Sequence, residues 1–149
     1  MAVETERKFL VTGEYKHLAY KKSEIIQGYL SSGPSSVVRV RIQDETARIG
    51  IKSKPLPGHF TRGEWEYEIA SKEAREIIEK CKPPLIQKTR YFIENGPHVI
   101  EVDEFHGVNE GLTVAEIELL NESDSFIKPD WLGEEVTCNP AYFNSNLAR

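Results

Sequence analysis

Hydrophobic and charged residues alternate along most of this chain with a period of two, which is typical of β-strands with two different faces. In the stretch VETERKFL, Val3–Leu10, the alternation places Glu4, Glu6 and Lys8 on one face. The same pattern recurs along the chain. It predicts eight strands, over 3–11, 25–30, 37–43, 47–54, 62–69, 86–93, 98–105 and 112–120.

Turn and helix signals divide these strands. Asn95-Gly96-Pro97 predicts a hairpin, and a helix is expected from Ser71 to about Lys80. A short helix after Thr12 and one or two short helices between 129 and 147 complete the prediction. We therefore expect an α+β fold that is mostly β: an eight-stranded antiparallel closed barrel with a few short flanking helices, formed by residues 1–149 as a single domain.

Charged pairs two residues apart stand on one face of nearly every predicted strand, and their signs come in blocks. Basic pairs lie on the third, fourth and sixth strands, and acidic pairs on the first, seventh and eighth. Such like charges destabilise a sheet unless something compensates them. The basic pairs are Arg39 and Arg41, Lys52 and Lys54, and Lys88 and Arg90; the acidic pairs are Glu4 and Glu6, Glu101 and Asp103, and Glu116 and Glu118.

Two interpretations of this charged face are open. One is a solvated sheet face with cross-strand ion pairs. The other is a barrel with a polar lumen, since eight strands enclose space for side chains or one small ligand. Arginine binds phosphate oxygens bidentately, and carboxylates hold hard divalent cations, so an oligophosphate with its metal would satisfy both halves.

Composition narrows the class of protein. The 149 residues carry a formal net charge of −5, which argues against nucleic-acid binding by bulk charge. Two distant cysteines, no apolar run of membrane-spanning length and a charged N-terminus predict a cytoplasmic protein with reduced thiols, no signal peptide and no membrane partner. The sequence leaves open whether the chain forms a homodimer.

The motifs together resemble the CYTH superfamily, the triphosphate tunnel metalloenzymes, in its short bacterial type. Glu4-x-Glu6-x-Lys8 matches the ExExK signature of that family. The resemblance continues through QGYL at 27–30, RVR at 39–41, IKS at 51–53, RGEWEYEI at 62–69, KTRY at 88–91, EVDEF at 101–105, AEIEL at 115–119, GEEVT at 133–137 and YFNSNLA at 142–148.

The resemblance implies a tunnel that acts on triphosphates with Mg²⁺ or Mn²⁺. It assigns metal binding to Glu4, Glu6, Glu116 and Glu118, with Asp103 nearby. It assigns phosphate binding to Lys8, Arg39, Arg41, Lys52, Arg62, Lys88 and Arg90. Lys52 with Tyr29 is the implied catalytic pair, because a lysine crowded by arginines has a depressed pKa. Lys54 is expected at the tunnel mouth, and whether Glu64, Glu66, Glu68 and Glu101 bind metal or pair with basic residues stays open.

We expect a metal-dependent triphosphatase that converts inorganic tripolyphosphate to diphosphate and phosphate. The loops at 31–36 and 55–61 carry little aromatic surface beyond Phe60, so the sequence offers no evident base pocket. The alternatives are a class IV-type adenylyl cyclase or a thiamine triphosphatase on the same scaffold, and a non-catalytic module that binds polyphosphate or nucleotide.

Overall fold

The structure is a computed structural model, and it describes residues 2–148 of the chain. Met1 and Arg149, the ends of the predicted domain, lie outside the described residues. Within that range the chain forms nine strands: β1 (Ala2–Val11), β2 (Ala19–Ser32), β3 (Ser36–Gln43), β4 (Thr46–Ser53), β5 (Thr61–Ile69), β6 (Ile86–Asn95), β7 (His98–His106), β8 (Thr113–Glu118) and β9 (Leu132–Glu135). Its helices are α1 (Ser71–Ile78), α2 (Asn144–Leu147) and short 3₁₀ turns at Lys16–Leu18, Gly107–Asn109 and Pro140–Tyr142.

The eight predicted strands are confirmed, with two differences. β2 begins at Ala19, six residues before the predicted start, because Lys21 and Lys22 pair with β6 although they break the alternation. β9 was not predicted. Its four residues follow no period of their own and are held against the end of β1, where Val11 pairs with Leu132. The predicted hairpin is confirmed, with Asn95 opposite His98.

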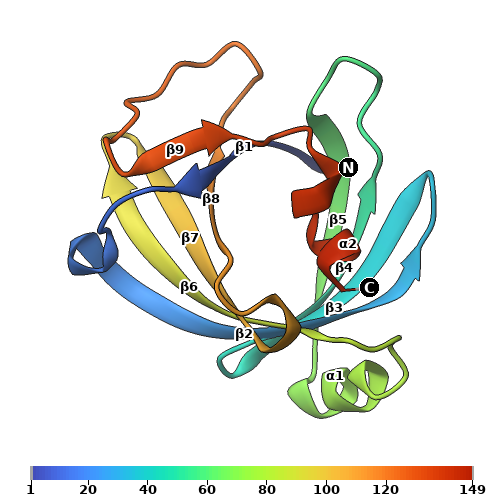
Figure 1. Ribbon diagram of the computed structural model, residues 1–149. Coiled ribbons are helices and arrows are strands. Elements are labelled where there is room, and N and C mark those ends of the chain that lie inside the picture. Colours follow the sequence, from blue (N-terminus) through green and yellow to red (C-terminus); the bar gives the residue numbers. More distant parts are fainter. Residues whose placement is uncertain (1, 149) are drawn as a thin grey trace.

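All strand pairs are antiparallel, in the order β5-β4-β3-β2-β6-β7-β8-β1-β9, and β5 also pairs with β1 (Figure 1). This last pairing, of Ala2–Thr5 with Thr61–Glu64, closes eight strands into a barrel, and we call it the barrel seam. β1 pairs along its other edge with β8, where Glu6 lies opposite Glu118. The seam therefore brings the first and fifth strands together and carries charged residues on both sides.

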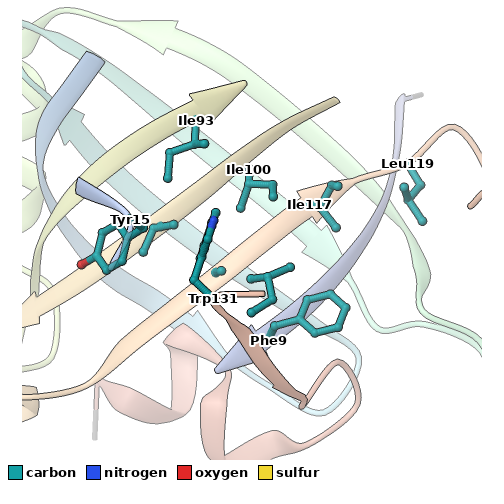
Figure 2. Packing of buried hydrophobic residues seen from close by; sticks show 10 residues of the cluster. Phe9, Tyr15, Ile93, Ile100, Ile117, Leu119 and Trp131 are labelled. Atoms are coloured by element: carbon teal, nitrogen blue, oxygen red, sulfur yellow. The ribbon is translucent and has the colours of Figure 1, made fainter. Parts of the chain in front are cut away.

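The largest apolar cluster lies outside the strand wall. Phe9, Ile100 and Ile117 point away from the lumen and pack with Trp131, under the segment that connects β8 to β9 (Figure 2). Because adjacent strand residues face opposite sides, Lys8 and Glu116 point inward beside these apolar neighbours. These outer-face contacts stabilise the fold without entering the polar cavity. A second apolar cluster, of Tyr29, Ile86, Phe105, Val114 and Ala148, includes residues on the inward faces of the strands.

Two further segments complete the barrel. α1 lies outside the ring of strands and buries Ala74 against Val40 and Ala47 of β3 and β4. The C-terminal segment crosses the barrel opening in Figure 1, and α2 lies within the outline of the ring. Among residues 2–148, no helix is long and apolar enough to cross a membrane.

Candidate active site in the barrel lumen

Inward side chains of the barrel line a cavity of about 680 Å³. The lining includes the predicted site residues of both signs, together with Glu64, Glu66 and Glu101. Asp103 is the exception and does not line the cavity. The predicted site residues that do are Glu4, Glu6, Lys8, Tyr29, Arg39, Arg41, Lys52, Arg62, Lys88, Arg90, Glu116 and Glu118. The alternation along the strands therefore selected the lumen-facing residues correctly.

A compact ion-pair cluster sits at the barrel seam. The Lys52 ammonium lies 2.8 Å from a Glu4 carboxylate oxygen and 3.5 Å from Glu64. The Arg62 guanidinium donates to the other Glu4 oxygen at 3.0 Å. Burial alone would raise the pKa of Glu4, but Lys52 and Arg62 outweigh it and hold that pKa well below its usual range. Glu4 is therefore ionised in this cluster.

In three neighbouring carboxyls, the charge of Lys52 does not outweigh burial and the nearby acidic groups. Burial, then repulsion by Glu116 and Glu4, raises the pKa of Glu6 well above its ordinary value. Burial, then a hydrogen bond with Glu4 and its charge, raises the pKa of Glu64 to about 7. The pKa of Glu118 is raised by burial and then by Glu4. This side of the lumen thus holds more acidic groups than its cations neutralise.

The excess of carboxyls fits a hard divalent cation, since carboxylate oxygens are the ligands that Mg²⁺ and Mn²⁺ prefer. Glu6 and Glu118 face each other across the β1–β8 pairing, and Glu4 and Glu116 flank them on the same strands. In the described part of the chain, however, no three His, Cys, Asp or Glu side chains gather closely enough to hold a metal ion as they stand. The carboxylate oxygens are thus suitable ligands for a divalent cation, although the four glutamates are spread along the barrel wall.

Asp103 has a different environment from the other predicted metal ligands. Its carboxylate lies 2.7 Å from the Lys88 ammonium and accepts two hydrogen bonds from Arg90, at 2.8 and 2.9 Å. Its side chain is 1% exposed. Burial alone would raise the pKa of Asp103, but Arg90 and Lys88 lower it to about 2. In this structure Asp103 serves as the counter-ion of two buried cations.

The arginines of β3 form the basic side of the cavity. Arg41 donates to the Gln27 amide oxygen at 2.9 Å, and Arg39 contacts Glu66 at 3.4 Å. Burial, then the charges of Arg39 and Arg90, lowers the pKa of Arg41 to about 9. Arg41 stays protonated at neutral pH, and no carboxylate of residues 2–148 is bonded to it, so this side of the lumen is suited to an anion.

The C-terminal segment provides acceptors to the same cations. The Lys8 ammonium donates to the Tyr142 backbone carbonyl at 3.1 Å, and Lys88 donates to the Asn144 side-chain oxygen at 2.9 Å. Gln27 also donates to Asn144, at 3.2 Å. The two lumen lysines therefore donate to neutral oxygen atoms. Phosphate oxygens could accept the same hydrogen bonds in their place.

Lys52 and Tyr29, the proposed catalytic pair, both line the cavity but have different partners. The Lys52 ammonium bonds Glu4, whereas the Tyr29 hydroxyl lies 3.3 Å from the Gln27 amide nitrogen, which donates to it. The pKa of Lys52 is lowered, first by burial and then by Arg39, in the direction that the sequence reasoning expected. Lys54 also lines the cavity, from the loop that connects β4 to β5.

The sequence patterns gave no role to Gln27 or Asn144. The loop of residues 54–60, where Lys54 was expected at the mouth and Phe60 was the one aromatic residue noted, lines the cavity. Gln27 shares the inward face with Tyr29, so the strand period was a usable signal for it. Asn144 belongs to the YFNSNLA stretch, whose only signal was the resemblance of the tail to family members. Its position beside Lys88 depends on the path of the C-terminal segment, which no local pattern encodes.

Comparisons with known proteins agree with this architecture. A family model described as CYTH domain matches residues 2–145. An inorganic triphosphatase of Acetivibrio thermocellus is 45% identical over 151 residues, covering 100% of this chain and 95% of that protein. An inorganic triphosphatase of Nitrosomonas europaea is 33% identical, covering 97% of this chain and 96% of its own length. A crystal structure of an inorganic triphosphatase superposes with a TM-score of 0.71 at 31% identity, covering 99% of this chain and 95% of the other.

Proposed function

Because the chain belongs to the CYTH domain family, we propose that it is an inorganic triphosphatase, which hydrolyses tripolyphosphate to diphosphate and phosphate inside the barrel lumen. The observation that carries the proposal is the charge arrangement of one cavity of about 680 Å³: cations of β3 and β6 face carboxyls of β1 and β8 across it. A phosphate chain binds the first group, and a cation that accompanies it binds the second.

The basic side chains hold the phosphate chain. Arg39 and Arg41 present guanidinium groups that match pairs of phosphate oxygens. Lys8 and Lys88 exchange the oxygens of Tyr142 and Asn144 for those of the substrate. Arg62 and Arg90 contribute positive charge from either side. These contacts neutralise the substrate and keep the phosphate chain extended, which positions its terminal phosphorus for attack.

We propose Mg²⁺ or Mn²⁺ as the cofactor, held by Glu4, Glu6, Glu116 and Glu118. When bound, such an ion offsets the negative charge on the phosphate oxygens and on the departing diphosphate. Burial raises the pKa values of Glu6 and Glu118, and a bound cation would favour the ionised form of both carboxyls. We assign Asp103 to the counter-ion role that its contacts with Lys88 and Arg90 support.

The chemical step is hydrolysis at the terminal phosphorus. Water forms a bond to that phosphorus, the bridging P–O bond to the middle phosphate breaks, and diphosphate leaves with the bonding electron pair. Lys52 is the candidate group to accept the proton of the water in its neutral amine form, after its ammonium has released a proton to solvent; burial and Arg39 favour that form because they lower its pKa. Tyr29, whose hydroxyl lines the same cavity, is the second candidate.

The test is product release from a panel of tripolyphosphate, ATP, thiamine triphosphate and diphosphate, each with Mg²⁺ or Mn²⁺. We expect the highest kcat/KM with tripolyphosphate. Cyclic AMP from ATP would identify an adenylyl cyclase instead, and a preference for thiamine triphosphate would point to stacking on Phe60 at the mouth. Binding of tripolyphosphate without turnover of any substrate would identify a non-catalytic module.

A further inference from the structure

Glu122 lies outside the lumen, in the segment between β8 and β9, and yet contacts the start of β5. One carboxylate oxygen accepts the backbone N–H groups of Phe60 at 3.0 Å and Thr61 at 2.9 Å. The other lies 3.0 Å from the Nδ1 atom of His59. Hydrogen bonds from Thr61, Phe60 and His59 lower the pKa of the Glu122 carboxyl to about 2, so it is ionised at neutral pH. One side chain therefore fixes three successive residues.

The turn that presents the carboxylate is held by hydrogen bonds of its own. Asp124 accepts the backbone N–H groups of Leu120 and Asn121, at 2.9 and 3.1 Å. One residue earlier, the Leu119 N–H donates to the Thr5 carbonyl of β1 at 2.7 Å. The turn is thus attached to β1, and Glu122 extends the attachment to β5.

These contacts meet at the end of the barrel seam. The seam joins four residues of β1 to four of β5, with Thr5 opposite Thr61 and Glu4 opposite Arg62. The hydroxyls of Thr5 and Thr61 also bond each other at 2.7 Å. Arg62, the residue directly after Thr61, donates to Glu4, a carboxylate of the proposed metal site. Glu122 therefore holds the backbone next to Arg62.

We propose that Glu122 is a positioning residue: by fixing Phe60 and Thr61 at the end of the barrel seam, it holds Arg62 against Glu4 and sets the carboxylate geometry that receives the divalent cation. This inference rests on the proposed function for its effect on turnover. Its structural part, the restraint of residues 59–61, stands independently. Loss of the restraint loosens the seam and acts on the lumen only through Arg62 and Glu4.

The variants separate the hydrogen bonds from the charge. Glu122→Gln retains one oxygen that can accept from both Phe60 and Thr61, whereas Glu122→Ala removes every contact. Glu110→Gln is the matched control, because it removes a carboxylate of 71% side-chain exposure from a different loop. Amide hydrogen exchange of residues 54–64 measures how strongly the backbone is restrained, and this measurement does not depend on enzymatic activity.

In Glu122→Ala we expect exchange at Phe60 and Thr61 to accelerate about tenfold or more, since both amides lose their acceptor. The metal concentration for half-maximal activity should rise about tenfold, within the range usual for partners of metal ligands, with kcat at saturating metal within about threefold of the wild type. Glu122→Gln should stay within about threefold of the wild type in exchange, and Glu110→Gln should match the wild type in both measurements.

Unchanged exchange in Glu122→Ala would overturn the proposal, as would a fall in kcat with an unchanged metal requirement. Equal effects of Glu122→Gln and Glu122→Ala on the metal requirement would also overturn it, because charge alone would then explain the result. If Glu122→Ala does not fold, Glu122→Asp takes its place, since its shorter side chain cannot reach both amides. An inactive wild type would contradict the proposed function, while the exchange data would still decide the restraint.

Discussion

Replacement of Asp103 by Asn distinguishes a buried counter-ion from a metal ligand. Asp103 contacts both Lys88, whose side chain is 0% exposed, and Arg90 at 8%. The amide preserves the shape of the side chain but removes the carboxylate that Lys88 and Arg90 share, and Arg90 then keeps only its contact with Glu101. Removal of one partner from a buried ion pair costs about 3–5 kcal/mol. For a chain of this length, such a loss lowers the melting temperature by roughly 10 °C.

The assay is thermal unfolding of Asp103→Asn and Glu101→Gln beside the wild type. Glu101 also bonds Arg90, at 2.9 Å, but its side chain is 30% exposed, so its replacement should have a much smaller effect. Tripolyphosphate should reduce the deficit of Asp103→Asn, because the anion supplies charge to Lys88 and Arg90 and binds the folded state. A melting temperature equal to that of the wild type, together with a higher metal concentration for half-maximal activity, would refute the counter-ion assignment.

The same ion pairs determine a pH dependence. The folded pKa of Asp103, about 2, lies below its ordinary value of 3.8. A depressed carboxyl pKa stabilises the fold above the ordinary value, and this stabilisation is lost as the pH falls toward the folded value. The contribution is on the order of 2–3 kcal/mol. We expect wild-type stability to decline between about pH 4 and pH 2, and Asp103→Asn to lack that part of the decline.

Three further predictions concern the lumen. Arg39→Ala should raise KM for tripolyphosphate more than it lowers kcat, because a phosphate contact present in the ground and transition states is lost; steady-state kinetics with the reverse pattern would contradict this role. Lys52→Ala should lower kcat about 10²-fold or more and alter the acid limb of the pH–rate profile. If its kinetic constants instead change as those of Arg39→Ala do, Lys52 is a phosphate contact. The general base must then be sought at Tyr29 or in metal-activated water. Glu6→Gln should abolish metal-dependent turnover yet leave the melting temperature close to that of the wild type, since burial, Glu116 and Glu4 already favour the neutral form of Glu6, which the amide resembles; full turnover across a range of metal concentrations would exclude Glu6 as a ligand.

The sequence predicted the facing of the lumen residues because the strand period fixes it locally. Arg39 and Arg41 must share one face of their strand, and Glu116 and Glu118 must share one face of theirs, independently of the rest of the chain. Closure into one ring then follows from burial of the apolar faces outside the wall, by Phe9 and its neighbours.

The ion pairs that the lumen residues form with one another could not be predicted from the strand period. Glu101 and Asp103 are equivalent in the EVD pattern, but the β6–β7 register places Arg90 opposite Asp103, and only Asp103 is fully buried. Lys52 meets Glu4 because the barrel seam brings β5, and with it β4, to β1. Both outcomes depend on register and closure between distant segments, as does the position of Asn144.

The most direct test of the central claim is a ³¹P NMR time course of tripolyphosphate with the protein and Mg²⁺ or Mn²⁺, run beside Glu6→Gln. The account predicts that the wild type forms diphosphate and phosphate in equal amounts, only when the metal is present, and that Glu6→Gln forms neither at a comparable rate. Persistence of tripolyphosphate with the wild type under both metals would contradict the account, as would equal turnover by Glu6→Gln.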